Sequence, residues 1–214
     1  MSDKPLIHVV DDDESLRVAL VRLLSASGYA ARGYASAGDF LLQPLEDRPG
    51  CLLLDLHMPG GPSGLELQAA LLRRGIDLPV VFLTGYGDMA SSVRALKAGA
   101  VDFLAKPVER DTLRVALQRA LAVDATRRAS RNQAAELFAR FASLTPRERS
   151  IFELIVAGRL NKQIAYELAV CERTVKSERA QLMHKLGAES VADLGRLAER
   201  LRQLEEPAQV QTLR

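Results

Sequence analysis

Short apolar segments alternate with amphipathic segments through the first 120 residues, and this alternation limits the folds available to the chain. The run Cys51-Leu-Leu-Leu-Asp55 has no charged residue before its last position, which is typical of a parallel strand buried on both faces. We predict strands at residues 6–10, 29–34, 51–55, 80–84 and 101–104. Helices are expected at 14–27, 37–42, 65–74 and 89–98, with a fifth beginning at Glu109. Five such units predict a doubly wound (βα)5 domain of the α/β class.

A different pattern begins after the fifth predicted strand. Residues 111–141 contain no Gly or Pro, and residues 122–140 are rich in Ala, Arg, Gln and Glu, which favours an extended helix or a semi-rigid linker. A small all-α domain is then expected, with helices at 146–157, 161–168, 172–186 and 191–204. Their predicted caps are Thr145 with Glu148, then Asn161, then Ser190. A short helix, a tight turn and a longer basic helix predict a helix-turn-helix. The predicted domains are therefore 1–122, a helical linker 123–142, and 143–206.

Charge is distributed unevenly along the chain, although the net charge is only +2. Residues 1–122 carry 13 Lys and Arg against 15 Asp and Glu, whereas the remainder carries 16 against 12. A basic second half indicates nucleic acid as a partner. The polar start and the absence of a long apolar run predict a cytoplasmic protein that does not contact a membrane. Cys51 and Cys171 lack metal or disulfide spacing and are expected to be reduced packing residues.

Charged or hydroxyl-bearing residues stand at the ends of four of the predicted strands. They are the run Asp11-Asp12-Asp13 after the first, then Asp55, Thr84 and Lys106 at the ends of the third, fourth and fifth. Ligands bind beyond the carboxyl ends of the strands in an open parallel sheet. The sequence therefore predicts one charged pocket built from all of these residues.

This set of residues suits a divalent metal and a phosphoryl group. A carboxylate such as Asp55 can attack phosphorus and become an acyl phosphate, and Mg²⁺ (or Mn²⁺) would screen the two anions. We expect Asp12 and Asp55 to bind the metal directly, with Asp11 acting through a water and the backbone carbonyl of His57 as a further ligand. Lys106 would neutralise one phosphoryl oxygen, and Thr84 would donate a hydrogen bond to another.

Each of these residues also has a simpler interpretation. The run Asp11-Asp12-Asp13 could cap the helix that begins at Glu14. Asp55 could be a turn residue, and Lys106 a surface charge. The occurrence of all of them at strand ends favours the pocket.

Residues 1–122 resemble the receiver domain of two-component response regulators, which has a flavodoxin-like fold. The matching motifs are Val9-Val-Asp-Asp12, Leu54-Asp-Leu-His-Met-Pro59, Leu83-Thr-Gly85, Lys97-Ala-Gly-Ala100 and Lys106-Pro107, and Thr84-Gly-Tyr-Gly-Asp88 is most similar to the FixJ-like branch. The resemblance implies phosphorylation of Asp55 by a sensor histidine kinase. It also implies a cis peptide before Pro107 and an aromatic switch residue at Phe103. Two departures from the family are a loop after Asp55 that is one residue longer and a Phe in place of the commoner Tyr at 103.

Residues 144–204 resemble the LuxR-type (GerE-like) helix-turn-helix domain. The matching motifs are Leu144-Thr-Pro-Arg-Glu148, Gly158, Asn161-Lys-Gln-Ile-Ala165, Arg173-Thr-Val-Lys176 and Lys185-Leu-Gly187. The first half of the helix at 172–186 would meet base edges through Thr174, Val175, Lys176 and Arg179. Lys162 and Lys185 would contact phosphates. The family commonly has Val-His where this chain has Ser177-Glu178, and a carboxylate there would repel phosphates or select a cytosine amino group. The alternative is a helical bundle with a solvated basic face.

These features together predict a transcription factor that is activated by phosphorylation and is not an enzyme. Its expected partners are a sensor histidine kinase, double-stranded DNA and RNA polymerase, with a homodimer forming on phosphorylation. One rival is an aspartyl-phosphate phosphatase, but it would need a carboxylate where His57 stands. The other is a constitutive DNA-binding protein whose first domain serves only as a dimerisation scaffold.

Overall fold

The protein is described from a computed structural model that covers residues 4–85 and 99–210, with side chains to residue 204. The chain divides into two compact units, Met1–Ala129 and Ser130–Arg214, and each is described by itself. The predicted helix at 89–98 lies outside the described residues. No helix in the described ranges combines the length and apolar character that crossing a membrane requires.

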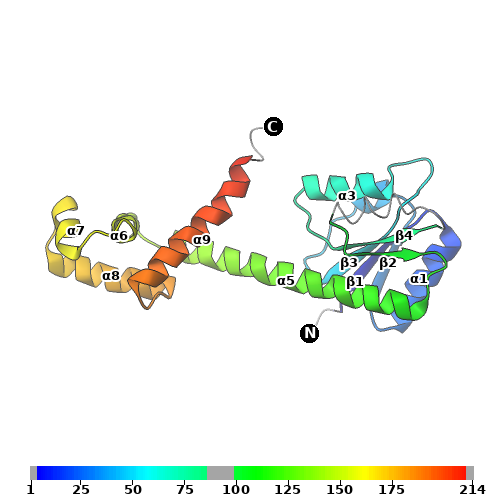
Figure 1. Ribbon diagram of the computed structural model, residues 1–214, viewed down its shortest axis with the longest axis horizontal. Coiled ribbons are helices and arrows are strands. Elements are labelled where there is room, and N and C mark those ends of the chain that lie inside the picture. The colour runs from blue at the N-terminus through cyan, green and yellow to red at the C-terminus, as the bar shows by residue number, and fades with distance from the viewer. Residues whose placement is uncertain (1–3, 86–98, 211–214) are drawn as a thin grey trace. The chain divides into compact units, whose positions relative to one another are not determined.

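The first unit is built on a five-stranded parallel sheet in the order β2-β1-β3-β4-β5 (Figure 1). The strands are β1 (Leu6–Val10), β2 (Ala30–Tyr34), β3 (Gly50–Asp55), β4 (Val80–Thr84) and β5 (Asp102–Ala105). The helices are α1 (Glu14–Ala26), α2 (Ala37–Leu41), α3 (Gly64–Arg73) and α5 (Arg110–Ala142). The predicted α/β fold is thus confirmed, and most predicted ends fall within one or two residues of those observed.

Alternation along β3 explains why helices cover both faces of the sheet. Cys51 and Leu53 pack in a cluster with α1 and α5, whereas Leu52 and Leu54 pack in a second cluster with α2 and α3. Every residue of β3 is buried. Each fully buried leucine contributes about 1.5–3 kcal/mol, so the strand is held firmly from both sides.

A turn of α5 fastens this helix to the amino-terminal edge of the same sheet. Asp124 is 3% exposed, and its Oδ2 accepts a hydrogen bond from the backbone N–H of Gly50 at 3.1 Å. Arg127 pairs with Asp77 at 2.6 Å, and Arg128 pairs with Asp47 at 2.8 Å. The first unit therefore uses residues beyond 122, and the predicted domain limits remain predictions.

Asp124→Ala should lower the free energy of unfolding of residues 1–129 by about 2 kcal/mol, because the buried N–H of Gly50 loses its acceptor. Urea unfolding followed by circular dichroism measures this change. Asp111→Ala, at an exposed aspartate on the same helix, is the control and should cost less than about 0.5 kcal/mol. Equal effects of the two variants would show that the contact at Gly50 contributes nothing.

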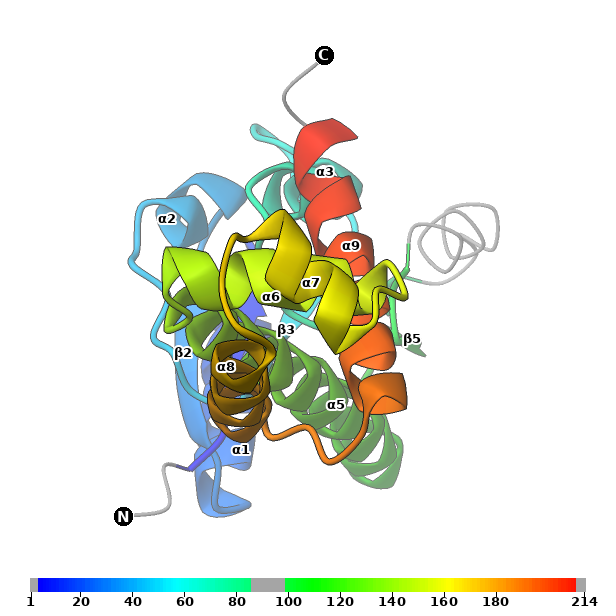
Figure 2. The ribbon, with the colours of Figure 1, turned by 90° about the vertical axis from the view of Figure 1, so that its left-hand side faces the viewer.

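The second unit contains the end of α5 and four further helices, which are drawn in Figure 2. They are α6 (Pro146–Val156), α7 (Asn161–Glu167), α8 (Glu172–Leu186) and α9 (Val191–Val210). Buried side chains from all four form one core, including Ile151, Ile164, Leu182 and Leu194. The predicted helical domain is therefore confirmed, and α9 continues six residues beyond its predicted end.

One predicted cap in this unit is wrong. Asn161 is the first residue of α7, and Leu160 occupies the N-cap position. The backbone N–H of Leu160 donates to the side-chain oxygen of Gln163 at 2.8 Å. The Asn161 oxygen instead accepts a hydrogen bond from Arg179 at 3.0 Å, which ties α7 to α8.

Candidate functional site

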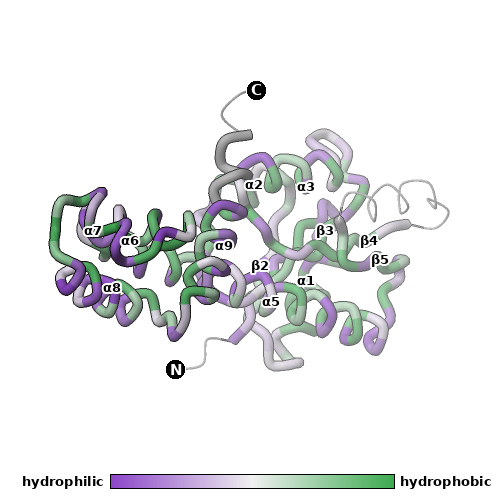
Figure 3. The backbone as a smooth tube through the Cα atoms, turned by 60° about the vertical axis from the view of Figure 1, so that its left-hand side comes forward, coloured by the Kyte–Doolittle hydropathy of each residue, from purple (hydrophilic) through white to green (hydrophobic). Residues whose placement is uncertain are grey.

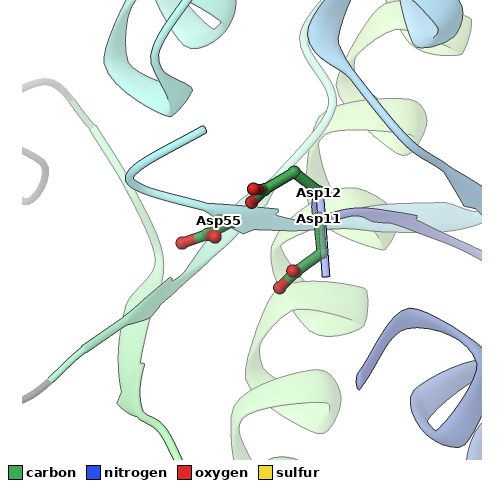
Figure 4. A group of neighbouring side chains, drawn as sticks. All are labelled: Asp11, Asp12 and Asp55. Atoms are coloured by element: carbon green, nitrogen blue, oxygen red, sulfur yellow. The ribbon is translucent and has the colours of Figure 1, made fainter. Parts of the chain in front are cut away.

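Three carboxylates meet at the carboxyl-terminal edge of the sheet (Figure 4). Asp11 and Asp12 follow β1, and Asp55 is the last residue of β3. One ligand oxygen from each lies within 4.8 Å of the others, with Asp11 and Asp55 buried and Asp12 exposed. The predicted convergence of these strand ends is therefore observed.

Asp13, the third acid of the run, caps a helix and does not join the three carboxylates. It is the N-cap of α1, and its carboxylate accepts the backbone N–H of Leu16 at 3.1 Å. The simpler interpretation of the acidic run thus holds for Asp13. Because one residue caps the helix, the carboxylates of Asp11 and Asp12 are left to face Asp55.

Lys106 completes the pocket from the residue after β5. Its ammonium nitrogen lies 2.8 Å from Asp11 Oδ2 and 2.9 Å from Asp55 Oδ2. It donates a hydrogen bond to Asp55 and forms an ion pair with Asp11. One ammonium therefore serves two buried carboxylates.

Burial and charge in this pocket favour a cation. Burial raises the pKa of Asp11, and Lys106 only partly offsets that effect. Burial alone would lower the pKa of Lys106, but its contacts with Asp11 and Asp55 outweigh burial and raise that pKa, so the side chain stays charged. Three carboxylates and one ammonium leave an excess of two negative charges. The oxygen donors and this excess of negative charge fit Mg²⁺ or Mn²⁺.

Thr84 and His57 flank the three acids. Thr84 ends β4, and its hydroxyl donates to the carbonyl of Gly85 at 3.2 Å. A hydrogen bond from this hydroxyl to a phosphoryl oxygen would replace that contact. The backbone N–H of His57 donates to Asp55 Oδ1 at 3.2 Å, which fixes the orientation of the carboxylate.

The two residues that were predicted to act in switching lie in and after β5. Phe103 is 41% exposed and pairs in register with Phe82 of β4. The peptide bond between Lys106 and Pro107 is cis, which confirms what the resemblance implied. The switch function of Phe103 stays a prediction.

In the second unit, the residues that α8 exposes differ from those that were predicted to contact DNA. Figure 3 shows hydrophilic and hydrophobic residues alternating along this helix. Val175 is 0% exposed and packs in the core with Leu182 and Leu186, so its predicted contact with a base is wrong. The helical period explains this, because residues seven and eleven positions apart share one face.

The outward face of α8 is basic and polar. Its exposed residues include Arg173, Lys176, Ser177 and Ala180, together with Glu172, whose Oε1 lies 3.7 Å from the Lys176 ammonium. Arg173 was missed as a candidate contact, although its spacing of three from Lys176 would have identified it. Thr174 is half-buried, with its hydroxyl 3.0 Å from the sulfur of Cys171, and Lys162 of α7 is exposed.

Glu178 does not face outward. Its Oε1 lies 3.0 Å from Arg147 Nε on α6, with 21% of its side chain exposed. Arg179 likewise points within the domain, to Asn161. The charge of Glu178 is thus partly neutralised by Arg147, and neither residue is free to read a base unless an internal contact breaks.

Lys185 also has an internal partner. Its ammonium lies 2.6 Å from Glu148 Oε2, and that hydrogen bond lowers the pKa of Glu148. Glu148 is 3% exposed and closes the capping box of α6 with Thr145. The predicted phosphate contact of Lys185 stays a prediction: the residue is exposed, but a phosphate would compete with Glu148 for its ammonium group.

Lys185→Met should lower the free energy of unfolding of the second unit by about 2 kcal/mol, because Glu148 is left buried without its cation. Thermal unfolding of the full chain measures it, with Lys162→Met, at an exposed lysine, as the control. The salt dependence of DNA binding should become shallower for Lys162→Met only. The opposite assignment of the two effects would restore Lys185 as a phosphate contact.

Comparison with known proteins identifies both units. Residues 7–118 match the family described as "Response regulator receiver domain", and residues 142–198 match "Bacterial regulatory proteins, luxR family". The chain belongs to the two-component response regulators. This response regulator is 41% identical to nodulation protein W of Bradyrhizobium diazoefficiens over 200 residues, covering 94% of this chain and 88% of that one.

Other relatives agree with this assignment. The transcriptional regulatory protein FixJ of Rhizobium meliloti is 40% identical over 192 residues, covering 90% of the response regulator and 94% of FixJ. The solved structure of the response regulator StyR is 43% identical with a TM-score of 0.81, covering 92% of this chain and 99% of that one. These relatives are regulators, and the chain is a helix-turn-helix regulator of transcription rather than an enzyme.

Proposed function

We propose that this response regulator accepts a phosphoryl group on Asp55 from a sensor histidine kinase, and that the acyl phosphate promotes dimerisation and DNA binding. The observation that carries the proposal is the Lys106 ammonium held between the buried carboxylates of Asp11 and Asp55. Such an arrangement balances charge around one carboxylate while leaving the acidic cluster able to recruit a cation.

The reaction is an in-line transfer. A carboxylate oxygen of Asp55 forms a bond to phosphorus while the phosphorus–nitrogen bond of a phosphohistidine breaks, and the released imidazole keeps the electron pair and takes up a proton. Lys106 shifts its hydrogen bond from Asp55 to a phosphoryl oxygen. Thr84 gives up the carbonyl of Gly85 and donates to another.

Asp11, Asp12, Asp55 and the backbone carbonyl of His57 would hold the metal ion. Bound Mg²⁺ supplies the charge that lets an anionic nucleophile approach an anionic phosphoryl group. Asp11 would gain from this charge, because burial opposes the charge of its own carboxylate.

DNA recognition is assigned to the outward face of α8. Arg173 and Lys176 are placed for base edges or phosphates, with Thr174 beside them and Lys162 of α7 for a phosphate. A homodimer would present two such helices to two half-sites. In this role the protein acts in the cytoplasm on double-stranded DNA and influences RNA polymerase.

Acetyl phosphate with Mg²⁺ tests the proposal without the kinase. Treated protein should double in mass in light-scattering chromatography and bind operator DNA more tightly in gel-shift titrations. Protein treated in EDTA is the control and should stay unchanged. Unaltered mass and DNA affinity after phosphorylation would contradict the proposed activation and leave the receiver as a scaffold.

A further inference from the structure

Arg17 contacts the acidic pocket from behind. It lies on α1, and its guanidinium Nη1 donates to the backbone carbonyl of Asp11 at 2.7 Å and to that of Asp12 at 3.3 Å. These are consecutive carbonyls, and they belong to the two residues whose side chains face Asp55. One guanidinium thus touches the main chain of two acids without touching their carboxylates.

The neighbouring strand leaves room for this contact. Gly33 of β2 pairs in register with Val9 of β1, two residues before Asp11. A Cβ atom at Gly33 would lie 2.9 Å from Arg17 Cγ and 3.2 Å from Cδ. The aliphatic part of the Arg17 side chain therefore passes over β2 at a residue that has no side chain. A larger residue at position 33 would obstruct it.

The two acids differ in what holds their carboxylates. Asp11 Oδ1 accepts the backbone N–H of Asp13 at 3.0 Å, and Oδ2 meets Lys106. Within the described ranges, no hydrogen bond or ion pair holds the Asp12 carboxylate, which is exposed. Figure 4 shows the two carboxylates leaving the chain on opposite sides of the end of β1. The direction of Asp12 therefore depends on its backbone.

Two consecutive carbonyls bound to one donor restrict the backbone dihedral angles on both sides of Asp12. We propose that Arg17 is a positioning residue for the metal site, which sets the main chain of Asp11 and Asp12 so that the Asp12 carboxylate is directed toward the cation before it binds. The inference rests on the proposed function, because it assumes that the acidic cluster binds Mg²⁺. Groups that orient metal ligands in this way affect affinity strongly without touching the metal.

The charge of Arg17 and its hydrogen bonds predict opposite effects of Arg17 on the affinity for Mg²⁺. A guanidinium near the pocket repels a divalent cation, so removing the charge alone would tighten Mg²⁺ binding. Removing the two carbonyl contacts would loosen it. The sign of the change therefore separates positioning from simple electrostatics.

Arg17→Met keeps most of the stem and removes both hydrogen bonds. In the full chain, titration calorimetry with Mg²⁺ alone should show a dissociation constant about tenfold higher than that of the wild type. Arg17→Lys, which keeps one donor group, should fall between the two. Arg22→Met, at an exposed arginine on the same helix, is the control for loss of charge and should stay close to the wild type.

Gly33→Ala tests the same contact with the charge retained. The new methyl group displaces the Arg17 stem, so Mg²⁺ affinity should fall as it does for Arg17→Met. The double variant should bind Mg²⁺ no more weakly than Arg17→Met alone, since the two substitutions remove the same contact. Urea unfolding of each variant reports any general loss of stability.

Unchanged or tighter Mg²⁺ binding by Arg17→Met would overturn the inference, even if the variant is less stable, because Arg17 would then only fasten the helix. A wild type that binds no Mg²⁺ at millimolar concentration would overturn the proposed function together with this inference. Wild-type binding that Arg17→Met leaves intact would overturn the inference alone.

Discussion

Asp55→Asn leaves the protein without a phosphoryl group after incubation with acetyl phosphate and Mg²⁺. The amide has the size of the carboxylate but lacks the anionic oxygen that forms an acyl phosphate. The amide also removes one of the three carboxylates that would hold the cation. Intact-protein mass spectrometry measures the result, and we expect complete loss of the added phosphoryl mass.

Asp13→Asn is the matched control for that experiment. Asp13 belongs to the same acidic run, but its carboxylate caps α1. Asparagine caps helices about as well as aspartate, so this variant should be phosphorylated like the wild type. Phosphorylation of Asp55→Asn like that of the control would mean that Asp55 is not the acceptor.

The double substitution Arg173→Ala with Lys176→Ala should weaken operator binding by about a hundredfold or more. Both side chains are exposed on α8, and a dimer would lose four cations in all. Loss of a base-contacting side chain costs about 1–3 kcal/mol, and each lost phosphate contact reduces the salt slope by about 0.9. Gel-shift titrations at several salt concentrations measure both quantities.

Arg202→Ala is the control for this second prediction. Arg202 is an exposed arginine on α9, paired with Glu199 at 3.1 Å. Its removal should change operator affinity by less than threefold, since an exposed pair contributes about 0–1 kcal/mol. If the α8 double variant bound operator as tightly as this control, the DNA-reading face would have to lie on another helix.

The sequence predicts the receiver pocket well because the pocket depends on topology. Parallel strands put their carboxyl ends at one edge, so the acids after β1, the acid that ends β3 and the lysine after β5 had to approach one another. The pattern of buried runs is sufficient for that conclusion. It requires no knowledge of side-chain rotamers.

The residues that α8 turns outward were predicted less well because they depend on the rotation of one helix. Val175 lies on the buried face of α8, and the side chain of Lys185 is long enough to reach back to Glu148. A sequence motif shows which residues lie near the start of a helix, but it does not show which of their side chains are buried in the core. The 3.6-residue period, applied from Leu182 and Leu186, would have placed Val175 correctly.

Contacts between side chains and the main chain were not predicted outside the helix caps. Arg17 donates to carbonyl oxygens, and Asp124 accepts from a backbone N–H at the far end of the same sheet. Backbone groups are present at every residue, so the sequence does not mark which one a side chain will reach. Gly33, a glycine in the middle of a strand, was the available signal of a close approach.

The same pocket bears on the two rival functions. A phosphatase would need a second carboxylate two residues after Asp55, but His57 stands at that position. A constitutive DNA-binding scaffold would have no need for an ammonium held between two buried carboxylates. The pocket therefore favours a phosphoacceptor over either rival.

Identification of the modified residue tests the central claim most directly. Protein treated with acetyl phosphate is reduced with borohydride, which converts an aspartyl phosphate into homoserine, and is then mapped by peptide mass spectrometry. The account predicts a single conversion at Asp55 that requires Mg²⁺ and disappears in EDTA. Conversion at another residue, or equal conversion at Asp55 without any divalent metal, would contradict it.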